Sequence, residues 1–224
     1  MTSFIFDMDG TLFQTDKILE RSLEDTFNRL RSFGQWNDVT PIEKYRQIMG
    51  VPLPVVWETL MPNHSIENHV QANATFHDHL IANILEGMGS LYPNVTEVFQ
   101  YLKDENCSIF IASNGQTEYL TSIVAHFGLD LWVTETFSIQ QISTQNKSDL
   151  VRFIMNKYKI SSGAVVGDRL SDIMAAKQNN LVSIGCNFDF AQEIELSQAD
   201  IVIDDLLELK TIFQEQLKTY TVQG

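Results

Sequence analysis

The sequence predicts an α/β protein in which a parallel sheet is interrupted, after its first strand, by a block of helices. Short apolar runs alternate with amphipathic stretches over most of the 224 residues. This alternation is typical of strands joined by crossover helices. Between about residue 15 and residue 88, amphipathic helices instead follow one another without a strand candidate. With 44% hydrophobic residues, the chain can bury a substantial core, which argues against disorder.

The first strand is the apolar run 4–6, which leads directly into Asp7, Asp9 and Gly10. A buried strand of this kind brings its carboxyl end to a surface, and ligand sites of open α/β sheets form at such ends. Two carboxylates at one strand end repel each other, so one is protonated or a cation is present. The alternative interpretation is an ordinary Asp-Gly turn after a strand.

The helical block is predicted to contain four helices, with Thr40 and Ser65 as N-cap residues. They span residues 16–32, 40–50, 53–60 and 65–87. The interruption predicts two domains. The α/β core comprises residues 1–14 and 89–224, and the helical cap domain comprises residues 15–88.

After residue 89, strands and helices alternate again. The further strands are predicted at 108–113, 163–167, 181–184 and 201–203, with short extended pieces at 132–133 and 137–139. The helices are predicted at 94–105, 117–127, 147–158, 171–179 and 206–217. Parallel strands with right-handed crossovers bring their carboxyl ends to the same edge of a sheet. We therefore expect a Rossmann-like parallel sheet core with an inserted α-helical domain.

Polar side chains with complementary chemistry follow several of these strands. They are Asp7 and Asp9 after the first strand, Ser113 and Asn114 after the second, Lys147 at a helix start, and Asp168 and Asp172 after 163–167. Clustered carboxylates suit Mg²⁺, which prefers oxygen ligands. A carboxylate can attack phosphorus, and a second acid can protonate the departing alkoxide. Hydroxyl, backbone amide and lysine groups can hold phosphoryl oxygens, so the set predicts phosphoryl transfer.

In this order, the motifs resemble those of the haloacid dehalogenase-like hydrolase superfamily. That pattern is D-x-D-G-T, then Ser or Thr, then a lysine, then G-D-x-x-x-D. This chain has residues 7–11, Ser113, Lys147 and residues 167–172 at the corresponding places. The helical block resembles the helical cap of the family. Two further stretches, 50–53 and 199–204, resemble the phosphoglycolate phosphatase-like branch.

The resemblance implies roles for the acidic residues. Asp7 would be the nucleophile and a Mg²⁺ ligand, and Asp9 the general acid/base, with its backbone carbonyl also on the metal. Asp168 would be a further metal ligand, and Asp172 would support the metal site from outside the ligand shell.

The resemblance also implies that Ser113, Asn114 and Lys147 bind the phosphoryl group, with Lys147 balancing the charge of the nucleophile. The family often has proline after this lysine, and this chain has Ser148. Ser113 has the alternative interpretation of a strand-end hydroxyl with no ligand.

The activity implied is Mg²⁺-dependent hydrolysis of a small phosphate monoester through an aspartyl-phosphate intermediate. One alternative is a β-phosphoglucomutase-like phosphotransferase. That group typically has a histidine twelve residues after the nucleophile, where this chain has Leu19. A further alternative is a non-enzymatic phospho-acceptor or binding protein on this fold. The substrate stays open among phosphoglycolate, nucleotides and sugar phosphates, and Arg21, Lys44 and Arg46 are candidate cations for its far end.

Charge and cysteine content limit the partners. A net charge of −14 opposes binding to nucleic acid or to anionic membranes. We find no apolar run of the roughly 18 to 20 residues that a membrane span requires, and no secretory signal pattern. Cys107 and Cys186 are predicted to be buried free thiols in a reducing compartment. We therefore expect a cytoplasmic protein that acts on a small phosphorylated metabolite.

Overall fold

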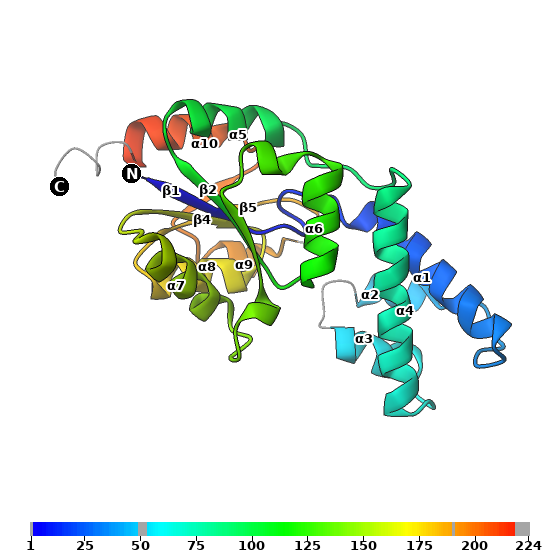
Figure 1. Ribbon diagram of the computed structural model, residues 1–224. Helices are drawn as coiled ribbons and strands as arrows, with labels where there is room; N and C mark the ends of the chain where they lie inside the picture. Colours follow the sequence, from blue (N-terminus) through cyan, green and yellow to red (C-terminus); the bar gives the residue numbers. More distant parts are fainter. Residues whose placement is uncertain (1, 49–52, 190, 218–224) are drawn as a thin grey trace. The chain divides into compact units, whose positions relative to one another are not determined.

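The computed structural model describes residues 2–48, 53–189 and 191–217 (Figure 1). The chain divides into two compact units. One, the core unit, comprises Met1–Gln14 and Leu91–Gly224. The other, the helical unit, comprises Thr15–Ser90.

Within its described residues, the core unit contains a six-stranded sheet in the order β3-β2-β1-β4-β5-β6. The strands are β1 Ser3–Phe6, β2 Ser108–Ser113, β3 Glu135–Ser138, β4 Gly163–Gly167, β5 Val182–Cys186 and β6 Ile201–Ile203. Each pair of neighbouring strands is parallel. The predicted α/β class with a parallel, Rossmann-like sheet is therefore confirmed.

The register of the sheet aligns the ends of its central strands. Phe6 of β1 is level with Ile111 of β2 and with Val166 of β4. From β1 the chain builds the sheet outward in one direction through β2 and β3, and in the other through β4, β5 and β6. The order in which strands are added therefore reverses between β1 and β4. Ligands of open α/β sheets bind beside such switch points.

Helices cover both faces of this sheet. The core unit contains α5 Val95–Asp104, α6 Thr117–His126, α7 Lys147–Tyr158, α8 Leu170–Gln178, α9 Glu193–Leu196 and α10 Glu208–Ile212. In Figure 1, α5 and α10 lie above the sheet, and α7 and α8 lie below it. Because both faces are covered, the strands are continuous apolar runs and not alternating ones. Ile5, Phe110 and Val165, from three neighbouring strands, belong to one buried cluster.

The helical unit contains α1 Asp16–Ser32, α2 Ile42–Gln47, α3 Leu53–Leu60 and α4 Ile66–Leu85, and no strand among its described residues. α1 and α4 make the largest helix contact of the unit. Phe27 and Phe76, one from each of these helices, are fully buried. Ser65 caps α4 as predicted, because its side chain accepts a hydrogen bond from the Asn68 amide. Gly50, the predicted end of the second helix, lies outside the described residues.

Three predicted elements differ from the structure. α2 begins at Ile42, with Pro41 and not Thr40 at the N-cap position. Trp132 and Val133 are not extended, because their amides bond to the Leu129 carbonyl and close a helical turn. The extended segment begins instead at Glu135.

The closing helix is the third difference, because α10 begins at Glu208 and not at Leu206. The Glu208 carboxylate accepts bonds from the Asp204 and Asp205 amides, which keeps those residues in a turn before the helix. A π-helical turn, Phe213–Leu217, follows α10.

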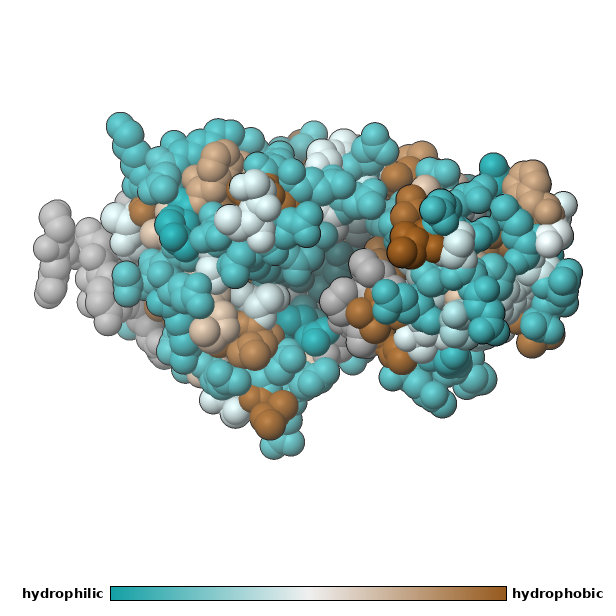
Figure 2. All heavy atoms as spheres, turned by 90° about the horizontal axis from the view of Figure 1, so that it is seen from below, coloured by the Kyte–Doolittle hydropathy of each residue, from teal (hydrophilic) through white to brown (hydrophobic). Residues whose placement is uncertain are grey.

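On the face shown in Figure 2, the surface of the described residues is mainly hydrophilic, as the net charge of −14 leads one to expect. Apolar side chains form small separate patches there. None of the helices in the described ranges has the length and apolar character that crossing a membrane requires. Cys107 and Cys186 are both buried thiols, as predicted.

Candidate active site

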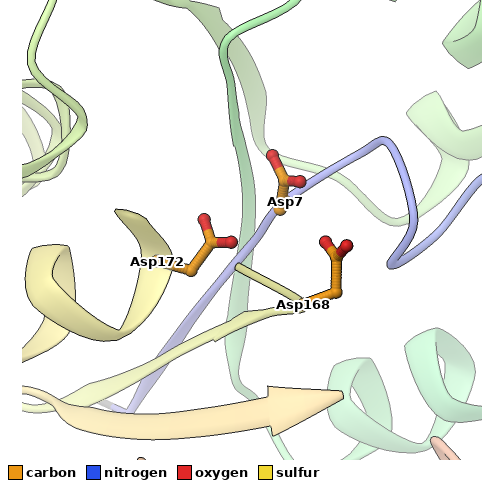
Figure 3. A group of neighbouring side chains, drawn as sticks. All are labelled: Asp7, Asp168 and Asp172. Atoms are coloured by element: carbon orange, nitrogen blue, oxygen red, sulfur yellow. The ribbon is translucent and has the colours of Figure 1, made fainter. Parts of the chain in front are cut away.

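Three buried carboxylates converge at the carboxyl ends of β1 and β4 (Figure 3). Asp7, Asp168 and Asp172 each offer one oxygen, and these oxygens lie within 4.8 Å of one another. The residues are 7%, 1% and 1% exposed, respectively. We call this group the acid cluster.

Strand ends and one helix start place the members of the acid cluster. Asp7 directly follows β1, and its amide donates to the Val166 carbonyl at 2.9 Å. Asp168 directly follows β4. Asp172 lies in the first turn of α8, where its carboxylate accepts a bond from the Arg169 amide. An acid in a first helical turn is favoured by the unpaired amides and by the helix dipole.

Two glycines allow the backbone to come close to these carboxylates. Gly10 has a φ of +76°, and a Cβ atom there would lie 2.5 Å from Asp168 Oδ2. A Cβ atom at Gly167 would lie 2.2 Å from the Asp172 carboxyl carbon. Thr11 Oγ1 donates to Asp168 Oδ1 at 3.1 Å, so the turn after β1 orients the acid after β4.

Lys147, the first residue of α7, contacts the acid cluster. Its side chain is 4% exposed, and Nζ is 2.5 Å from both Asp7 Oδ1 and Asp172 Oδ1. The buried ammonium therefore bridges two buried carboxylates. Another lysine of α7, Lys157, pairs with Glu135 on the surface and lies outside this group.

Burial and like charges raise the pKa values of the acids. Burial raises the pKa of Asp168 to about 7, and electrostatic repulsion from Asp172 is the second contribution to this rise. Burial also raises the pKa of Asp7, although Lys147 opposes the shift. Burial by itself would lower the pKa of Lys147, but the carboxylates of Asp172 and Asp7 raise it, so this lysine stays charged.

The charge balance of the acid cluster fits a divalent cation. With all three carboxylates ionised, one ammonium leaves an excess of negative charge in a buried place, which is costly without a counter-ion. The donor set consists of oxygen atoms only, which hard divalent ions prefer. The cluster could therefore hold such an ion.

Asp9 lies outside the acid cluster, although it is two residues from Asp7. Its side chain is half-buried, and its Oδ1 accepts a hydrogen bond from the Tyr119 hydroxyl at 2.6 Å. Sequence reasoning missed Tyr119. It lies in the first turn of α6, six residues after Ser113, and no motif marks it.

The segment after β2 presents a serine and a tight turn. Ser113 is buried, and its Oγ accepts a bond from the Gly115 amide at 2.9 Å. Ser138, at the end of β3, donates to the Gly115 carbonyl at 2.6 Å and so fixes the same turn. The side chain of Asn114 is exposed. Predicted phosphate-binding residues therefore lie on a braced turn next to β1.

The candidate cations of the helical unit are engaged within that unit. Arg21 pairs with Asp25. Arg46 pairs with two glutamates on α1 and α2, Glu20 and Glu43. Lys44 donates to the Thr59 carbonyl.

Comparison with known proteins identifies the family. A family model described as haloacid dehalogenase-like hydrolase matches residues 4–186. The chain belongs to this family. The matched range includes all members of the acid cluster, as well as Asp9, Ser113 and Lys147.

Curated relatives of this hydrolase are distant and differ in their named activities. A 5'-nucleotidase of Pseudomonas aeruginosa is 20% identical, and the match covers 87% of this chain and 86% of that protein. A pyrophosphatase PpaX of Listeria welshimeri is 22% identical, with 96% and 98% covered. A phosphoglycolate phosphatase of Haemophilus influenzae is 27% identical, with 54% and 57% covered, so this chain spans little more than half of its length.

The fold is shared with solved structures over almost the whole chain. The crystal structure of a predicted phosphoglycolate phosphatase from Haemophilus somnus matches with a TM-score of 0.82 and 20% identity. The match covers 96% of this chain and 98% of that one. At this identity the likeness shows the fold.

Proposed function

We propose that this hydrolase is a Mg²⁺-dependent phosphatase that cleaves small phosphate monoesters through an aspartyl phosphate on Asp7. The observation that carries the proposal is the acid cluster, in which Lys147 bridges Asp7 and Asp172 and Asp168 lies alongside. A buried carboxylate held beside a fixed cation, at the switch point of the sheet, is suited to attack a phosphoryl group.

The proposed first step transfers the phosphoryl group to the protein. A carboxylate oxygen of Asp7 forms a bond to phosphorus while the ester P–O bond breaks. The departing alkoxide takes a proton from the Asp9 carboxyl group. Burial raises the pKa of Asp7, and the Lys147 ammonium beside it opposes that rise and so favours the ionised, nucleophilic form.

The proposed second step releases phosphate. Asp9, now ionised, takes a proton from a water molecule as the water oxygen bonds to phosphorus. The bond between phosphorus and Asp7 breaks, which restores both carboxyl groups to their starting states. One residue thus acts as acid and then as base, as a two-step displacement requires.

Mg²⁺ would be held by Asp7, Asp168 and, as the family resemblance implies, the backbone carbonyl of Asp9. When bound, it would offset the negative charge of the carboxylates and of the phosphoryl oxygens. Asp172 contacts Lys147 and the Arg169 amide, so we assign it the support of these groups. Ser113, the backbone at Asn114 and Lys147 would hold the phosphoryl oxygens.

We infer a small phosphorylated metabolite as the substrate, in the cytoplasm, where thiols such as Cys107 and Cys186 stay reduced. The relatives are named for nucleotide, pyrophosphate and phosphoglycolate substrates, so they do not select one. Because residues 50–53 and 199–204 resemble the phosphoglycolate phosphatase-like branch, phosphoglycolate is the first ester to assay. A mutase would instead convert one hexose monophosphate into another without releasing phosphate.

Phosphate release from a panel of esters, with Mg²⁺ and with EDTA, tests the proposal. We expect turnover with Mg²⁺ that is lost in EDTA and in Asp7→Asn. Asp104→Asn is the matched control, because Asp104 is an exposed carboxylate on α5 that bonds to Gln100. Failure of every ester, or an Asp7→Asn protein as active as the control, would refute the proposed function.

A further inference from the structure

The hydrogen bond from Tyr119 to Asp9 has no counterpart in the motifs that identify the family here. We propose that Tyr119 is a positioning residue that orients the carboxyl group of Asp9 for proton transfer to the leaving group. This inference rests on the proposed function, because it takes Asp9 as the general acid.

Tyr119 is itself firmly placed. It is 4% exposed and lies in the first turn of α6, directly after the braced turn at Gly115. A Cβ atom at Gly115 would lie 3.2 Å from the Tyr119 ring, so the missing side chain leaves room for that ring. Its hydroxyl is therefore a donor at a position fixed by packing.

Asp9 follows β1, is half-buried and forms an isolated β-bridge with Phe13, so its backbone is placed while its side chain keeps rotamers that a donor can select. A short acidic side chain in a turn can adopt several rotamers, and ordering it costs free energy. General acid catalysis requires the acid oxygen within hydrogen-bond reach of the leaving oxygen. The 2.6 Å bond lies within the range of bonds from a hydroxyl to a carboxylate.

The same bond can persist through both proposed steps. A carboxylate oxygen accepts a hydrogen bond when the group is ionised, and the carbonyl oxygen of a protonated carboxyl group still accepts one. Tyr119 can therefore hold Asp9 when it donates a proton and when it later takes one.

Comparing two classes of ester in the Tyr119→Phe variant tests this role. An alkyl phosphate needs a proton on its leaving oxygen, whereas p-nitrophenolate leaves readily without one. The measured quantity is kcat/KM with Mg²⁺, which reports the steps up to the first irreversible one. We expect a loss of about 10- to 100-fold for the alkyl ester, which is part of the effect typical of a general acid, and less than about threefold for p-nitrophenyl phosphate.

Tyr158→Phe is the matched control. Tyr158 also donates its hydroxyl to a carboxylate, that of Glu135, but on the surface, where the residue is 37% exposed. This variant should retain wild-type kcat/KM for both esters. Circular dichroism and the thermal midpoint of Tyr119→Phe establish that it is folded. Equal losses for the two esters, or no loss for either, would overturn the inference.

The Asp9→Asn variant separates this inference from the proposed function. If the wild-type protein turns over no ester, or if Asp9→Asn retains the alkyl activity, the proposed function fails. If Asp9→Asn loses alkyl activity and Tyr119→Phe does not, only the positioning role fails. Because Tyr119 acts through Asp9 in our account, adding Tyr119→Phe to Asp9→Asn should cost less than about twofold.

Discussion

Asp7 and Asp9 leave the same strand two residues apart, but their side chains occupy different environments. Asp7 is buried among Asp168, Asp172 and Lys147. Asp9 is half-buried and bonds to the neutral hydroxyl of Tyr119. The first environment pairs a buried carboxylate with the Lys147 ammonium, and the second gives a half-buried carboxyl group a hydroxyl donor. The comparison teaches that neighbours in a motif can occupy different environments because the fold gives them different partners, and we propose different roles for them on this ground.

The largest expected difference is catalytic. Asp7→Asn removes the proposed nucleophile, so we expect a loss of about 10⁴-fold or more in turnover of every ester. Asp9→Asn removes a proton donor, and we expect a loss of about 10²- to 10⁴-fold for alkyl esters. For p-nitrophenyl phosphate the expected loss in kcat/KM is smaller. Steady-state phosphate release measures the activity of both variants. Equal losses across all esters in the two variants would contradict separate roles for Asp7 and Asp9.

The next largest effect concerns the stability of the buried cluster. Lys147→Met removes the ammonium between Asp7 and Asp172, and breaking a buried ion pair typically costs about 3–5 kcal/mol. Lys157→Met breaks a surface pair with Glu135 and should cost about 0–1 kcal/mol. Urea unfolding in EDTA at pH 8 measures both. If the two variants lose similar amounts of unfolding free energy, Lys147 does not form a buried ion pair with Asp7 and Asp172.

The pH dependence of stability should differ with and without Mg²⁺. Burial and Asp172 raise the pKa of Asp168 to about 7, and burial raises that of Asp7. The folded protein then binds more protons than the unfolded one, so its unfolding free energy in EDTA falls as pH rises from about 4 through 7.

Mg²⁺ binds ionised carboxylates, so the rise in Tm that it produces should be larger at pH 8 than at pH 5.5. Thermal unfolding at the two pH values, in EDTA and in Mg²⁺, measures this difference. An equal or larger rise at pH 5.5 would contradict the assignment of the acid cluster as the ion site.

The smallest expected effect comes from the turn that follows the two carboxylates. Gly10→Ala strains a residue at a φ of +76° and also places a Cβ atom 2.5 Å from Asp168 Oδ2. Gly34→Ala meets a similar φ of +68° with no atom within 4 Å. Positive φ alone costs about 1 kcal/mol, so the control should lose that amount and Gly10→Ala about 2–3 kcal/mol. Only Gly10→Ala should also weaken Mg²⁺ binding, as measured by calorimetry.

The sequence made the sheet and the acid cluster predictable for a physical reason. Asp7 and Asp168 directly follow apolar runs that are long enough to be buried strands, and parallel strands end at one edge. The start of α7 was predictable as well, so Lys147 could be placed at a helix terminus. The order of the strands was not predictable from the sequence, because residues far apart in sequence decide which strands pair.

Other features were not predictable from local patterns. Tyr119 is 110 residues from Asp9, and a tyrosine in a first helical turn carries no motif. The contact between Lys147 and Asp172 depends on how α7 and α8 pack. Trp132 and Val133 suggested a strand because they are apolar, but their backbone N–H groups donate hydrogen bonds to the Leu129 carbonyl and close a turn there.

The most direct test of the central claim is detection of the phosphorylated residue. The Asp9→Asn variant would be mixed with Mg²⁺ and p-nitrophenyl phosphate and quenched in acid, because slow hydrolysis should let the intermediate accumulate. Borohydride reduction converts an aspartyl phosphate to homoserine, and mass spectrometry of the peptides locates it. Our account predicts homoserine at position 7 and unchanged Asp168 and Asp172. Modification at another carboxylate, or none during turnover, would contradict it.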